Sequence, residues 1–329
     1  MPSRVNDDPL FDLLSYARPG PGQRDHLTPA QAQQVARTVG HAPEVMVKVL
    51  SQGANDTSAV RRHLDYIGRK GEVDLETDNG EILRGARAGK DLVKDWDLDL
   101  DALRSRADLV SRPGRASPRL VHKLIFSMPA GTPPDSLLRA VQNFCREEFA
   151  LKHRYALALH TDEPHPHVHA VLKAVSEQGE RLNIRKALLR RWRAEFAQHL
   201  RALGVPANAT QRYIRGETSP RKTDGIYRAA LRGESTHMRD RAELVARALF
   251  TGDMQVEPGK GKLVKTHNYV RQAWLAVSEI LIQGRQPALA AQVRYFAEHL
   301  PPPMTEREWL AGRLAENVRQ PRTREGPGR

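Results

Sequence analysis

The chain has 329 residues, enough for one large or two modest domains, and its 52 Lys and Arg against 39 Asp and Glu give a net charge of +13. This excess of positive charge favours a polyanionic partner such as nucleic acid, without choosing between DNA and RNA. One cysteine, Cys145, excludes a disulfide framework, and no apolar run approaches the roughly 18 residues of a membrane span, so we expect a cytoplasmic protein without membrane insertion.

The predicted elements begin after an N-terminal extension, residues 1–42, which we interpret as part of the domain that follows. Strands are expected at 45–50, 120–128, 155–159 and 168–171, with a further hairpin inside 72–83 that turns at Asp78-Asn79-Gly80. Helices are expected at 29–39, 56–69, 86–95, 99–110, 132–150 and 186–203. Residues 43–205 therefore form a predicted α+β domain, with a central, largely antiparallel sheet flanked by helices.

A basic stretch follows this domain, and residues 206–235 are interpreted as a DNA-binding extension or linker. From Arg181 to Arg232 there are 13 Lys and Arg and only three acidic residues, with Trp192, Tyr213 and Tyr227 interleaved. Such a pattern is typical of a surface that tracks phosphates and stacks bases, or alternatively of a solvated helix face with core aromatics. Beyond it we expect an α-helical C-terminal region at 236–319 and a disordered tail at 320–329.

Four of the 13 histidines lie within the ten residues from His160 to His169. Apolar runs on either side predict two strands joined by a turn around residues 163 and 164. Antiparallel pairing then sets His160 opposite His167, with His169 on the diagonal and all three side chains on one face. Opposed Cβ atoms lie roughly 5 Å apart, so three imidazoles can converge on one metal ion and leave positions open, as catalytic sites do. A histidine-rich surface hairpin is the alternative.

Other polar residues of the same hairpin can support the three histidines. Asp162 and Glu163 can orient a ligand imidazole or bind a proton, and His165 can do either or be solvated. Together with the basic charge, an open metal site indicates phosphodiester chemistry, for which the nucleophile is water or one of seven tyrosines. Tyr66 has the most suggestive context, because nearby cations can hold a phosphate and stabilise a phenolate, namely Arg61, Arg62, Arg69 and Lys70.

Three blocks resemble, in the family's order, the motifs of conjugative relaxases, the mobilisation nucleases of the histidine-hydrophobe-histidine endonuclease superfamily. Leu64-Asp-Tyr66-Ile-Gly-Arg-Lys-Gly71 resembles the nucleophile motif, and Ser127-Met-Pro-Ala-Gly-Thr132 resembles the second motif. His160 to His169 resembles the histidine motif. The similarity is greatest to the agrobacterial T-DNA border endonuclease and related plasmid relaxases. The nucleophile of this family usually lies nearer the N-terminus, which leaves Tyr16 as a rival to Tyr66.

The resemblance implies a role for each matching residue. Tyr66 is the expected nucleophile and Asp162 its acidic partner, while His160, His167 and His169 are the expected ligands of a divalent ion, Mg or Mn. Glu163 and His165 are expected at most to support these ligands. The expected DNA contacts are Arg69, Lys70, Ser127, Arg185, Lys186, Arg190, Arg212 and Arg215.

The implied function is site- and strand-specific nicking and joining of single-stranded DNA at a transfer origin. Relaxosome accessory proteins and a type IV secretion coupling protein are the implied partners. A rolling-circle replication initiator or transposase of the same superfamily shares this chemistry and differs in its DNA. A metal-dependent hydrolase would instead use water as the nucleophile, and a non-catalytic basic DNA-binding protein would need no nucleophile at all.

Overall fold

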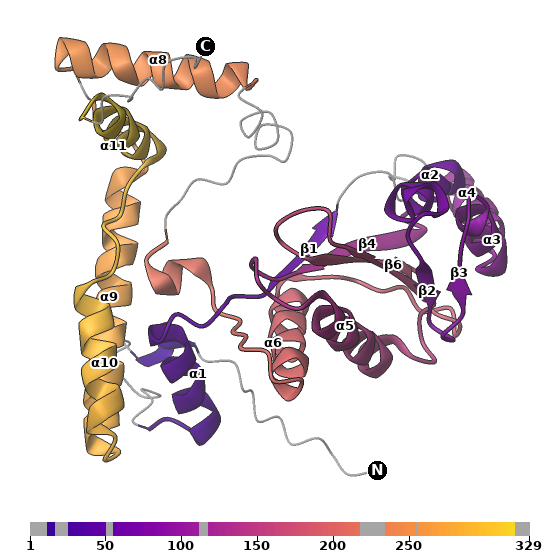
Figure 1. Cartoon of the computed structure of the whole chain (residues 1–329), viewed down its shortest axis with the longest axis horizontal. Coiled ribbons are helices and arrows are strands. Elements are labelled where there is room, and N and C mark those ends of the chain that lie inside the picture. Colours follow the sequence, from indigo (N-terminus) through magenta and orange to yellow (C-terminus); the bar gives the residue numbers. More distant parts are fainter. Residues whose placement is uncertain are drawn as a thin grey trace, which may run out of the picture. The chain divides into compact units, whose positions relative to one another are not determined.

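The computed structural model describes residues 12–16, 26–50, 55–111, 118–217, 234–253 and 255–319 (Figure 1). The chain divides into two compact units. One comprises Gly40–Ala209, and the other combines Met1–Val39 with Thr210–Arg329. Each unit has its own hydrophobic core.

The first unit is built on a six-stranded sheet with the order β1-β4-β6-β5-β2-β3, in which every neighbouring pair is antiparallel. Its strands are β1 Met46–Leu50, β2 Leu75–Thr77, β3 Ile82–Leu83, β4 Val121–Ser127, β5 Tyr155–His160 and β6 His167–Lys173. The predicted histidine hairpin, β5 and β6, therefore lies in the middle of the sheet. This arrangement confirms the α+β class with a central antiparallel sheet.

Helices cover both faces of the sheet (Figure 1). One face packs on α5 (Pro134–Phe149) and α6 (Lys186–Ala202). The other packs on α2 (Thr57–Ile67), α3 (Ala88–Asp95) and the start of α4 (Leu98–Ser111). Strand alternation divides β6 between them, because Val168, Ala170 and Leu172 face the first pair while Val171 faces the second group. His167 and His169 have the parity of Val171, so they lie on the α2 side.

The start of helix α2 and the face that it turns to the sheet both follow from its sequence. Asp56 caps the helix, and its carboxylate accepts hydrogen bonds from the backbone N–H groups of Ser58 and Ala59. Buried residues recur at Val60, Leu64 and Ile67, a spacing of four and three that makes one apolar stripe. The stripe faces the sheet, and the polar positions between its members are left at the rim and surface of the domain.

The second unit is helical. Its elements are η1 Leu13–Tyr16, α1 Pro29–Val39, η3 Arg212–Arg215, α8 Thr236–Thr251, α9 Lys260–Gln283, α10 Pro287–Glu298 and α11 Glu306–Arg319. Leu13, Tyr16 and Val35 pack with α9 and α10 in one core. The interpretation of the N-terminal stretch as part of the following domain therefore does not hold for residues 12–16 and 26–39, whereas residues 40–42 do belong to that domain. The expected tail and the basic residues 218–233 lie outside the described part of the chain.

No described helix is both long enough and apolar enough to cross a bilayer.

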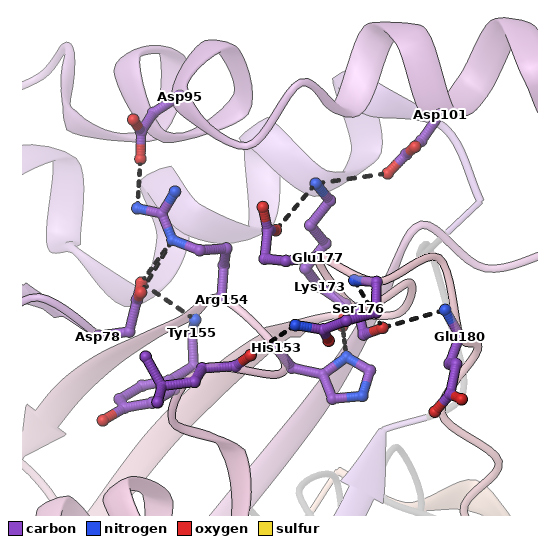
Figure 2. A network of polar contacts seen from close by, with 12 residues as sticks. Asp78, Asp95, Asp101, His153, Arg154, Tyr155, Lys173, Ser176, Glu177 and Glu180 are labelled. Atoms are coloured by element: carbon purple, nitrogen blue, oxygen red, sulfur yellow. Dashed lines mark hydrogen bonds and ion pairs between the residues drawn. The ribbon is translucent and has the colours of Figure 1, made fainter.

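A polar network crosses the hairpin at the end remote from the histidines (Figure 2). The Arg154 guanidinium donates through Nε to both oxygens of Asp78, at 2.8 and 3.0 Å, and through Nη2 to Asp95 at 2.7 Å. Asp78 follows β2 and Asp95 ends α3. Arg154 therefore ties the turn after β2 and the end of α3 to the start of β5.

We expect Arg154→Ala to lower the free energy of unfolding by about 2 kcal/mol, because the largely buried Asp78 carboxylate loses its partner. Urea unfolding followed by circular dichroism measures the change. Arg84→Ala is the matched control, since the Arg84–Asp74 pair is exposed and should contribute little. Equal urea midpoints of unfolding for the two variants would show that Arg154 does not stabilise the contact between these elements.

Candidate active site

Three histidines converge where β5 ends and β6 begins. His160 pairs directly with His167, and His169 lies two residues further along β6 on the same face, so the predicted register is confirmed. One nitrogen from each ring lies within 4.8 Å of those from the other two. His160 and His169 are buried and His167 is half-buried. The group therefore presents three imidazoles from a rigid central hairpin at one point.

Hydrogen bonds fix which nitrogens are free to bind a cation. A carbonyl oxygen only accepts, so His160 donates from Nε2 to the Ile67 carbonyl at 2.7 Å, and His167 donates from Nδ1 to the His165 carbonyl at 3.1 Å. This leaves His167 Nε2 as an unprotonated nitrogen, and the lone pair of His160 Nδ1 faces the Arg69 guanidinium at 3.5 Å. Nδ1 of His169 is buried without a hydrogen-bond partner among the described residues. Such a donor set fits a divalent ion.

Burial favours the neutral form of two of the three histidines, His160 and His169. Burial, and then the neighbouring His160 and His167, lower the pKa of His169 to about 3. Burial also lowers the pKa of His160. Neutral imidazole is the form that binds metal, so protons compete weakly for His169.

Tyr66 lies beside this group. It sits near the end of α2, between the buried anchors Leu64 and Ile67, and its side chain is 48% exposed. Its ring centroid is 6.5 Å from that of His169. The rival Tyr16 is fully buried in the helical unit, where its hydroxyl donates to Gln31 Oε1 at 3.2 Å. Only Tyr66 of the two presents an accessible phenol.

Residues 68–205 match the family model for the relaxase nuclease domain of MobA/VirD2-like type. This segment is a relaxase nuclease domain. The match contains the three histidines and Ser127 and begins two residues after Tyr66, so the tyrosine is linked to the site by its geometry. The chain has no match among curated proteins. The match supports a relaxase-type DNA-nicking function.

An unusual loop of the relaxase domain carries Arg69 to the histidines. Arg69, Lys70 and Gly71 have positive φ angles of 48°, 57° and 103°, so two of the three are non-glycine residues in a strained region. The Arg69 guanidinium bonds the Asp162 carboxylate and lies 3.5 Å from His160 Nδ1. It also lies 5.3 Å from the centroid of the Tyr66 ring. The strained loop thus brings one cation to Tyr66, Asp162 and His160 together.

Gly71 is required by this loop for two reasons. Its φ is 103°, and an added Cβ would meet Gly85 backbone atoms at 2.3 Å. We expect Gly71→Ala to cost more than about 2 kcal/mol of stability and to displace Arg69, because both strain and a backbone clash oppose the methyl group. Thermal unfolding measures this cost. Gly80→Ala, also at positive φ but in open space, should show the strain alone and a smaller effect.

The second relaxase motif packs against the histidine motif. Ser127, directly opposite His167 in the sheet, is buried and donates its hydroxyl to the Pro166 carbonyl at 3.3 Å. His165 Nδ1 accepts a hydrogen bond from the Ala130 N–H at 3.0 Å. Both contacts hold the turn before His167, which gives Ser127 and His165 a structural task in this state. Glu163 is exposed in the turn.

The expected DNA contacts on α6 are not near the histidines. Arg185, Lys186 and Arg190 are exposed, but α6 covers the sheet face opposite to the histidines. Arg212 and Arg215 belong to the helical unit, and both bond Glu217, at 3.1 and 2.8 Å. Of the expected DNA-contacting cations, Arg69 lies at the histidine site. Lys70, the next residue in the chain, is exposed.

The interpretation of Trp192 as a base-stacking residue is wrong. The Trp192 side chain is fully buried and donates through Nε1 to Glu148 at 2.9 Å. With Phe196 and Leu200 it forms the apolar stripe of α6, so the hydrophobic effect places it inside. Tyr213 packs against the core of the helical unit, and Tyr227 lies outside the described residues.

His63 is a neighbour of the site that the sequence analysis did not single out. Its ring centroid lies 6.4 Å from Tyr66 and 6.1 Å from His169. Burial, and then the Lys123 ammonium, lower the pKa of His63 to about 4. The available signal was the three-residue spacing of His63 and Tyr66, which puts both side chains on one side of a helix.

Proposed function

We propose that the protein is a site- and strand-specific relaxase that nicks single-stranded transfer-origin DNA with Tyr66 as nucleophile. The observation that carries the proposal is the accessible Tyr66 ring, 6.5 Å from His169 of the three-histidine group and adjoining the relaxase domain. A nucleophile beside a cation site is the arrangement that phosphodiester transesterification needs.

In the proposed reaction, the phenolic oxygen of Tyr66 forms a bond to the phosphorus of the scissile phosphate. The bond between that phosphorus and O3′ breaks, so the chain retains a 5′-phosphotyrosyl strand and releases a 3′ hydroxyl. The phenolic proton leaves to a base, and O3′ gains a proton. Because the phosphotyrosyl bond keeps the energy of the broken linkage, the same residues can rejoin the strands.

His160, His167 and His169 are the proposed ligands of the divalent ion, which we expect to be Mg or Mn. When bound there, it would neutralise charge on the non-bridging oxygens of the scissile phosphate. Arg69 lies beside both His160 and Tyr66, so we assign it a phosphate contact. Asp162, held by the same guanidinium, is assigned to orient Arg69 and to accept a proton.

The setting of the proposed reaction is conjugative transfer of a plasmid or other mobile element. Accessory relaxosome proteins would expose the single strand, and a type IV secretion coupling protein would receive the covalent complex. Basic residues at the start of α6, and separately those in η3 of the helical unit, are assigned to flanking DNA: Arg185, Lys186, Arg190, Arg212 and Arg215.

The deciding experiment uses single-stranded oligonucleotides that tile the DNA flanking the coding sequence, labelled at either end, with Mg or Mn. On a denaturing gel the 3′ label should migrate with the protein, while the 5′-labelled fragment should be free and end in a 3′ hydroxyl that a polymerase extends. A 5′ label on the protein would reverse the proposed polarity. Cleavage without any adduct would indicate water as the nucleophile, and binding without cleavage would indicate a non-catalytic protein.

A further inference from the structure

The rings of His63, Tyr66 and His169 form a closed cluster at the edge of the candidate active site. Their centroids are separated by 6.4, 6.1 and 6.5 Å, so each ring contacts the other two. His63 and Tyr66 are nearly parallel, with 22° between their planes, whereas His169 meets both edge-on. His63 is therefore packed against the proposed nucleophile and a proposed ligand at once.

Tyr66 needs such a support because little else restrains it. The apolar stripe of α2 faces the sheet, while the Tyr66 side chain is about half exposed. An exposed tyrosine exchanges among several staggered rotamers on a fast timescale, and only some of them keep the phenol at the histidines. The guanidinium of Arg69 lies over the ring, but it belongs to the loop after the helix. His63 comes from the helix itself.

Packing alone does not account for a histidine at position 63. Its Nε2 is buried and has no hydrogen-bond partner among the described residues. An aliphatic side chain would fill the space without an unpaired buried nitrogen, but it would not offer a flat ring to Tyr66. We therefore attribute the histidine at position 63 to its planar ring, which packs against the ring of Tyr66.

We propose that His63 is a positioning residue whose ring holds the Tyr66 ring against His169. The inference rests on the proposed function of Tyr66 as nucleophile. Shifting an attacking atom by about 1 Å can slow a reaction about 100-fold, so we expect His63→Ala to slow adduct formation about 10- to 100-fold at saturating DNA. His63→Phe keeps a flat ring and should react within about threefold of the natural protein, with an unchanged pH profile.

The position of Tyr66 can be measured without DNA. In protein carrying ¹³C-labelled tyrosine and histidine rings, with Mg present, proton contacts between Tyr66 and His169 are expected in the natural protein and in His63→Phe. They should disappear in His63→Ala. Tyr66→Phe assigns the tyrosine signal, and His122→Ala is the matched control, because His122 is another histidine with a buried ring nitrogen that has no hydrogen-bond partner among the described residues. His122→Ala should retain the contact.

Three results would overturn the inference. The Tyr66–His169 contact could survive in His63→Ala, or His63→Ala could react at the natural rate. His63→Phe could keep the contact and yet react as slowly as His63→Ala with an altered pH profile, which would assign His63 to proton transfer. If the natural protein forms no adduct on any DNA, the proposed function fails, while the ring contacts still decide whether His63 positions Tyr66.

Discussion

Tyr66→Phe is expected to abolish the covalent protein–DNA species, with a loss of at least about 1,000-fold in the rate of nicking. Phenylalanine keeps the ring between His63, Arg69 and His169 but lacks the oxygen that attacks phosphorus. A denaturing gel with 3′-labelled DNA measures the loss directly. Because Tyr66 is exposed, the variant should unfold at the same temperature as the natural protein.

The matched control for this prediction is Tyr295→Phe. Tyr295 is also exposed, but it lies on α10 in the helical unit, so its variant should form the adduct at the natural rate. An adduct that persists in Tyr66→Phe would assign the nucleophile to another residue. Cleavage that persists without an adduct would instead support water as the attacking group.

His169→Phe is expected to lower the affinity for Mn more than about 100-fold and to abolish metal-dependent nicking, because it leaves only two imidazoles. Phenylalanine keeps a flat ring and the edge-on contacts of a residue that is 95% buried, and its slightly larger ring should cost little, so the fold should survive. Titration calorimetry with Mn measures the affinity, and the oligonucleotide assay measures nicking over a range of Mn concentrations.

His199→Phe controls for the loss of any histidine. His199 lies on α6, on the other side of the sheet, where its Nε2 is 3.4 Å from Glu147. Its variant should bind Mn and nick DNA as the natural protein does. Natural Mn affinity in His169→Phe would remove His169 from the ligand set, and a three-histidine site would then be wrong.

Local patterns in the sequence carried the prediction of the histidine group. Strand alternation and the position of the turn are enough to place His160 opposite His167, since both properties belong to one hairpin. The approach of Tyr66 to that hairpin is different, because it depends on packing between α2 and the sheet. No periodicity within either segment encodes that distance, and only the family resemblance pointed to it.

Charge and aromatic content were less reliable than strand patterns for predicting which residues contact DNA. A count of cations along residues 181–232 does not say which face of a helix they occupy, and α6 presents Arg185 and Arg190 away from the histidines. Trp192 lies among these cations in sequence but inside the core in space. The domain to which the N-terminal apolar residues belong could not be predicted for a related reason. An apolar pattern indicates that a surface is buried, without identifying the element that buries it.

The hydrogen bond from His160 to the Ile67 carbonyl joins the cation site to the residue directly after Tyr66. A cation held at the opposite nitrogen of His160 would make that N–H a stronger donor and tighten the last turn of α2. Thermodynamic reciprocity then requires that disorder in this turn weaken cation binding.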